Sequence, residues 1–208
     1  MRVNRWIGAL FAVGSTCFAV GPFPGYVHLV GSAADGVTFF VGSIFFTSAA
    51  ALQLLTTPRG DRGNWFASLI QFAGTLLFNL STFDAMNEAL DTAAENRLVW
   101  APDSFGSICF LVASGIAYAV VRESGDRAAW RIAVLNLLGS VAFGISAVAS
   151  YIVPETGSEL DLAASNLTTV VGALCFLAGG LLLMRSPDPD ESPAVAVADA
   201  PRRADAGL

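Results

Sequence analysis

Few side chains in this sequence could form a catalytic or metal site. His28 is the single histidine, and a haem or metal site normally needs two or more converging ligands. Cys17, Cys109 and Cys175 each precede a phenylalanine inside an apolar segment, where cysteine packs as a small apolar residue. The sequence contains no recognisable nucleophile–base pair and no phosphate-binding loop. It therefore predicts a protein that is not an enzyme and has no catalytic residue, metal or cofactor.

Acidic and amide side chains are the remaining polar candidates. Eight acids border or occupy two connecting segments: Asp84, Glu88, Asp91, Glu95, Asp103, Glu155, Glu159 and Asp161. They lack the Asp-x-Asp-x-Asp-Gly pattern of a calcium loop, so we expect solvated loops, with cation binding as the alternative. Inside the apolar segments, the candidates for the bundle interior are Gln71, Asn79 and Asn136. Amides without charged neighbours more often join helices than bind solutes, so a solute pathway is the alternative here.

The segments that must position these residues are strongly apolar. Of the 208 residues, 54% are hydrophobic and 13% are charged, and the mean hydropathy is +0.62. A soluble domain averages about 25% charged residues, and with so few charges its surface would be covered by apolar patches. This composition excludes a disordered chain, a nucleic-acid-binding protein and a disulfide-rich secreted module. It predicts a multi-pass membrane protein whose main partner is the lipid bilayer.

Six segments are long and apolar enough for spanning helices, which need about 20 residues. They are 6–23, 37–57, 65–83, 103–121, 131–153 and 164–184, and none has a charged residue in its interior. All 11 basic side chains are arginines, and every one except Arg97 falls on the same side of these segments. The positive-inside rule then predicts that both termini are cytoplasmic in the plasma membrane. Without a charge inside the bilayer, ion or proton transport is disfavoured.

Each expected helix contains one copy of a motif, Gly-[Ser/Thr/Ala]-x-x-Phe. The copies are defined by Gly14 and Phe18, Gly42 and Phe46, Gly74 and Phe78, Gly106 and Phe110, Gly139 and Phe143, and Gly172 and Phe176. Glycine lets a neighbouring helix approach closely, and a phenylalanine one turn away lies on the same face, so we interpret the motif as a helix-packing device. The copies in the first, third and fifth helices lie 60 and 65 residues apart, and those in the second, fourth and sixth helices lie 64 and 66 residues apart. We therefore expect an all-α fold of three repeated helical hairpins, 1–58, 59–124 and 125–185, and a disordered tail, 186–208.

A two-helix unit with this motif in both helices resembles the YrhK-like family of small bacterial membrane proteins. On that resemblance the chain is similar to three such units fused over about residues 1–185. The resemblance implies a helical fold in the bacterial inner membrane, and it brings no catalytic residue with it.

Two functions from different classes remain open. The first is a membrane scaffold or accessory module without catalytic activity, bound to another membrane protein or to a second copy of itself. The alternative is a channel or transporter that passes a small neutral or lipid-like solute through the six-helix bundle. A core filled by the motif phenylalanines would argue against a pathway, whereas a continuous polar cavity would argue for one.

Overall fold

Six long helices form the structure, a computed structural model that describes residues 3–187. They are α1 (Val3–Val20), α3 (Ser32–Thr56), α4 (Arg62–Asp84), α6 (Ala101–Val121), α7 (Arg127–Ala149) and α8 (Leu162–Leu183). Each is part of a helical stretch long and apolar enough to cross a membrane. The predicted all-α membrane fold with six spans is confirmed.

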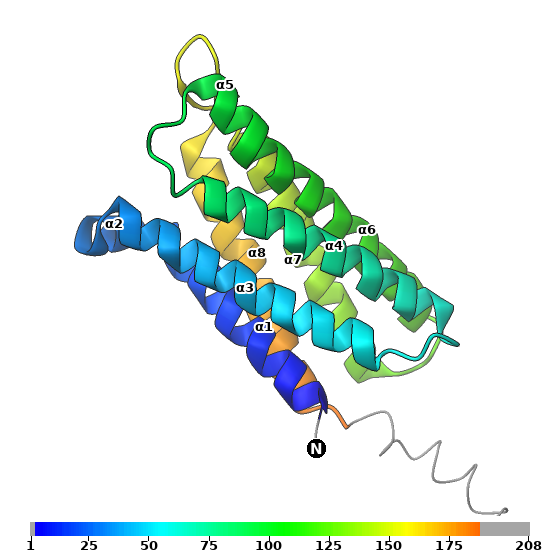
Figure 1. Ribbon diagram of the computed structural model, residues 1–208. Coiled ribbons are helices and arrows are strands. Elements are labelled where there is room, and N and C mark those ends of the chain that lie inside the picture. Colours follow the sequence, from blue (N-terminus) through cyan, green and yellow to red (C-terminus); the bar gives the residue numbers. More distant parts are fainter. Residues whose placement is uncertain (1–2, 188–208) are drawn as a thin grey trace, which may run out of the picture.

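The six helices pack in chain order into a closed ring (Figure 1). Each helix contacts the next, and α8 returns to contact α1. The first turn of α1 and the residues after α8 meet at one end of the ring, where Asn4 Nδ2 donates a 2.7 Å hydrogen bond to the carbonyl oxygen of Pro187. We call this end the arginine face, because it includes Arg5, Arg59, Arg62, Arg122, Arg127, Arg131 and Arg185. The opposite end, which contains the eight acids named above, is the acidic face.

Short elements connect the helices at the acidic face. They are α2 (Pro24–Val30), α5 (Thr92–Glu95), a π-helical turn η1 (Asn96–Trp100), and the antiparallel strands β1 (Ile152–Val153) and β2 (Ser158–Glu159). The Asn96 side chain donates to the Ile152 carbonyl oxygen at 2.7 Å and accepts from the Ile152 amide at 3.0 Å. These two bonds fix the β1–β2 hairpin beside the turn that leads into α6.

The helix ends differ from the predicted spans by a few residues. α1 ends at Val20 rather than residue 23, and α7 runs from 127 to 149 rather than from 131 to 153. α4 and α7 begin early because the side chains of Asp61 and Asp126 accept hydrogen bonds from their first amides. Charged residues therefore lie within the terminal turns of the observed helices, outside the interiors of the predicted spans, which carry no charge.

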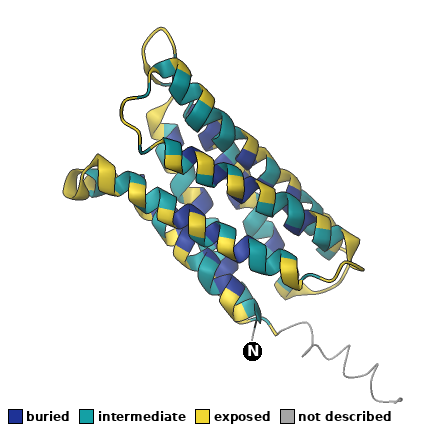
Figure 2. Cartoon of the chain, viewed as in Figure 1, coloured by how far each residue is buried: buried dark blue, intermediate teal, exposed yellow. Residues whose placement is uncertain are grey.

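The long helices carry buried residues toward the inside of the bundle and exposed residues on the outside (Figure 2). The interior contains glycine, alanine, phenylalanine and hydroxyl residues, and Ser15, Ser43, Thr75 and Ser140 are all 0% exposed. The outer surface presents large apolar side chains such as Leu167 and Val148, each 64% exposed. Small residues between helices and large apolar residues outside are what packing within lipid requires.

Candidate functional site

Within each hairpin, the two motif glycines face each other. The pairs are Gly14 with Gly42, Gly74 with Gly106, and Gly139 with Gly172. In the last pair, a Cβ placed on Gly139 would lie 3.0 Å from the carbonyl oxygen of Gly172 and 2.9 Å from Cε2 of Phe176. Five of the six glycines leave space both for the opposite backbone and for the phenylalanine of the opposite motif, and Gly42 leaves space for the side chains of Cys17 and Phe18.

The six motif phenylalanines meet in the middle of the ring, and none is more than 8% exposed. Phe18, Phe78 and Phe143 form one triangle, with ring centroids 6.1–6.4 Å apart. Phe46, Phe110 and Phe176 form a second triangle, with ring centroids 5.6–6.2 Å apart. The two rings of each hairpin connect the triangles at 5.0–5.5 Å. We call these two layers the phenylalanine cluster.

Hydroxyl and amide groups join neighbouring hairpins. Between α3 and α4, Thr47 Oγ1 donates to Asn79 Oδ1 at 3.1 Å. Between α6 and α7, the hydroxyls of Ser114 and Ser140 lie 2.7 Å apart. Asn79, a candidate polar residue of the bundle interior, thus lies at a boundary between two hairpins and bonds across it.

A cavity of about 480 Å³ opens at the arginine face. The other two candidate interior residues, Gln71 and Asn136, line it together with Gln53. Phe176 of the phenylalanine cluster is also part of its lining. The amide groups that line this cavity therefore lie next to the phenyl rings of the phenylalanine cluster.

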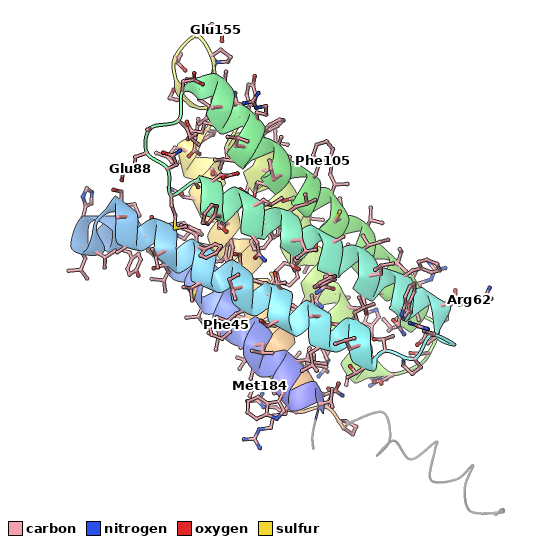
Figure 3. All side chains as sticks on the ribbon, viewed as in Figure 1. Phe45, Arg62, Glu88, Phe105, Glu155 and Met184 are labelled. Carbon is pink, nitrogen blue, oxygen red and sulfur yellow. The ribbon has the colours of Figure 1, made fainter. Side chains whose placement is uncertain are left out.

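A second cavity, of about 530 Å³, opens at the acidic face, and we call it the acidic cavity. All six long helices and the connecting elements contribute to its lining, which includes Phe18, Phe78 and Phe143 of the cluster. Four carboxylates line it: Asp35, Glu95, Asp103 and Glu159. Figure 3 shows the neighbouring acids Glu88 and Glu155 at this end, with Arg62 and Met184 at the other end.

Sequence reasoning placed three of these carboxylates in or beside solvated loops and missed the fourth, Asp35. A signal was nevertheless present. Asp103 precedes Ser107 and Phe110 by four and seven residues, so all three lie on one face of α6. Asp35 stands in the same relation to Phe39 and Gly42 on α3. Counting back from the motifs in helical turns would have placed both acids between the phenylalanine cluster and the acidic face.

The environment of Glu159 favours its uncharged form. Burial raises the pKa of this carboxyl, a hydrogen bond with the Ser165 side chain lowers it, and the nearby Glu95 carboxylate raises it. The net direction is upward. Both the burial of Glu159 and the nearby Glu95 carboxylate therefore oppose its ionisation.

The cysteines and His28 lie elsewhere. Cys17 and Cys109 pack against Gly42 and Gly74, and all three cysteines are free and half-buried. His28 is exposed on α2. Between residues 3 and 187, the structure has no group of three or more His, Cys, Asp or Glu side chains arranged to hold a metal ion.

Compared with known proteins, the chain matches no family model, no curated protein and no solved structure. Two cavities, at opposite ends of a closed helical ring, meet a layered aromatic cluster between them. Such an arrangement can close the ring to solutes and can bind a molecule from either end.

Proposed function

We propose that this protein is a non-catalytic membrane scaffold or accessory module whose helical ring is closed by the phenylalanine cluster. The observation that supports this function is the mutual contact of all six motif phenylalanines between the two cavities. A solute crossing the ring would have to displace two layers of packed rings. The six spans, by contrast, present apolar surface suited to lipid and to a second membrane protein.

The orientation is part of the proposal. The arginine face is assigned to the cytoplasm, since arginine is retained on that side during insertion. Both termini are then cytoplasmic, and the acidic cavity opens to the outside of a bacterial plasma membrane. The threefold hairpin repeat and the resemblance to YrhK-like proteins belong to the same proposal, and the recurrence of the glycine contact between α1 and α3, α4 and α6, and α7 and α8 supports the repeat.

Solute permeability tests the scaffold function. The full chain is reconstituted into liposomes, and the uptake of glycerol and urea is followed by stopped-flow light scattering. We expect the same rates as in protein-free liposomes. A protein-dependent rate would overturn the proposal. As a sensitivity control, the double variant Phe78→Ala, Phe110→Ala removes two rings that lie 5.0 Å apart and should raise the rate, provided that gel filtration shows it to be folded.

A channel or transporter for a small neutral or lipid-like solute is the second candidate. The observation that favours it is the presence of cavities at both ends, with Gln71 and Asn136 lining the one at the arginine face. A movement of the phenylalanine layers would connect the two cavities.

The accessibility of Gln71 from each side distinguishes the two candidates. Gln71→Cys is made after Cys17, Cys109 and Cys175 have been replaced by alanine, and a membrane-impermeant thiol reagent is added from either side. If the protein is a scaffold, the thiol introduced at position 71 is labelled only from the arginine face, because the phenylalanine cluster blocks access from the acidic face. Labelling from the acidic face as well would support the transporter instead.

A further inference from the structure

The acidic cavity combines aromatic rings, hydroxyl groups and carboxylates in its lining. Its walls contain the rings of Phe18, Phe23, Phe39, Phe78, Phe143 and Trp100. Hydroxyls of serine and threonine residues on α4, α6, α7 and α8 lie among them. Between these groups are the four carboxylates, and the described residues that line the cavity include no basic side chain.

Two of the four cavity acids have a carboxylate oxygen without a partner, whereas several other acids at the same face have structural partners. The carboxylates of Asp91 and Asp161 accept hydrogen bonds from amides at the starts of α5 and α8, and Glu88 accepts one from Ser32. In the cavity, Asp35 Oδ1 and Glu159 Oε2 are shielded from solvent and have no hydrogen-bond partner within residues 3–187. Shielded carboxylate oxygens without a partner are costly, and a bound group can supply the missing interaction.

We propose that the acidic cavity binds a small organic ammonium ion with an apolar body. This goes beyond the scaffold function, because a closed ring can still bind a ligand at one end. The ammonium group provides positive charge for the carboxylates, and its carbon substituents and charge both suit the aromatic faces. A volume of about 530 Å³ lies within the usual range of small-molecule sites.

A bare metal ion fits this cavity less well than an organic cation. Calcium requires six to eight oxygens around one point, and magnesium requires a near-octahedral set. The part of the chain that the structure describes holds no such convergent group. The four acids instead come from α3, α5, α6 and β2, so they are spread around the walls. Distributed charge over aromatic walls suits a diffuse cation.

The repulsion between the carboxylates supports the same ligand. Glu95 is close enough to Glu159 to raise its pKa, in addition to the larger effect of burial. A cation between them would offset this repulsion and favour the charged form of Glu159. Because the cavity is partly enclosed, the attraction is stronger there than between fully solvated charges.

Isothermal titration of the full chain in dodecyl maltoside micelles tests the proposal, with benzyltrimethylammonium as the probe. We expect saturable binding that benzyl alcohol, a neutral aromatic compound, does not reproduce. The double variant Asp103→Asn, Glu159→Gln should raise the Kd about tenfold or more. Glu155→Gln is the matched control, since Glu155 lies in the same loop as Glu159 but is exposed and outside the cavity. It should leave the Kd nearly unchanged.

Several outcomes would overturn the proposal: no saturable heat at millimolar probe, equal binding of benzyl alcohol, or equal weakening by Glu155→Gln. The last would show attraction by the whole acidic face rather than by the cavity. Gel filtration checks that the double variant is folded. Competition by phosphocholine distinguishes the two sources of an ammonium group. If phosphocholine displaces the probe, the site takes a lipid headgroup; if it does not, the site takes a free amine.

Discussion

Replacing Gly139 by alanine tests whether close helix contact within a hairpin stabilises this fold. A Cβ at this position would lie 2.9 Å from Cε2 of Phe176 and 3.0 Å from the carbonyl oxygen of Gly172. The ring belongs to the phenylalanine cluster and the carbonyl to the backbone of α8, so neither can move without disturbing its neighbours. Gly144, five residues later on α7, has no atom within 4 Å of such a Cβ and is the matched control.

The expected magnitude follows from two opposing effects. Alanine in place of glycine favours a helix by about 1 kcal/mol, and this gain applies at both positions. Overpacking costs about 1–3 kcal/mol, and it applies only to Gly139→Ala. The gain cancels in the comparison, so Gly139→Ala should be less stable than Gly144→Ala by about 1–3 kcal/mol. For a chain of this length, this corresponds to a Tm lower by roughly 2–12 °C.

Thermal unfolding in detergent, followed by circular dichroism, measures this difference. Both variants are compared with the unchanged protein at one detergent concentration and one heating rate. If Gly139→Ala and Gly144→Ala have the same Tm, the hairpin contact does not limit stability and the reasoning from the glycine distances is refuted. A Tm for Gly144→Ala at or slightly above that of the unchanged protein would complete the expected result.

Three further perturbations follow from the structure. Phe110→Ala should lower the free energy of unfolding by about 3–5 kcal/mol, because the ring is 1% exposed. Phe105→Ala on the same helix should lower it little, because that ring is 62% exposed and points away from the bundle (Figure 3). Equal Tm values for the two variants would contradict the central packing of the cluster. Burial raises the pKa of Glu159, so this group contributes stability below its ordinary pKa and loses it as the pH rises through the raised value. Glu159→Gln should therefore raise the Tm at pH 8 but leave it unchanged near pH 4, and a gain that is constant with pH would point to another cause. Asn96→Ala removes both hydrogen bonds to the Ile152 backbone and should lower the free energy of unfolding by about 1–3 kcal/mol. Amide hydrogen exchange should become faster over residues 150–160 and stay unchanged in α1.

Membrane residence and the six spans could be predicted from the sequence because both depend on local chemistry. A helix that crosses lipid needs a long apolar stretch, and that stretch is visible in the residues themselves. Helix ends were less predictable. The spans were drawn from apolar residues alone, whereas α4 and α7 begin where Asp61 and Asp126 cap them, at Arg62 and Arg127.

The candidate site was only partly accessible to sequence reasoning. Gln71, Asn79 and Asn136 share an apolar context, yet Gln71 and Asn136 line a cavity while Asn79 bonds to Thr47. Gln71 and Asn136 each stand three residues before a motif glycine and so share a helix face, but which helix packs against that face is known only from the tertiary structure. The acids of the connecting segments divide in the same way. Asp91 caps a helix and Asp103 lines the acidic cavity, although both belong to the same acidic stretch.

The sequence by itself determined that this chain is helical, spans the membrane six times and contains a glycine–phenylalanine motif once in each span. Only the tertiary structure decided that the helices close into a ring and that six phenylalanines, up to 158 residues apart, stack as two triangles. It also brought carboxylates from α3, α5, α6 and β2 into one cavity. The physical reason is that hydropathy and helical periodicity are properties of a few consecutive turns. A cavity, in contrast, depends on which faces of helices distant in the sequence pack together.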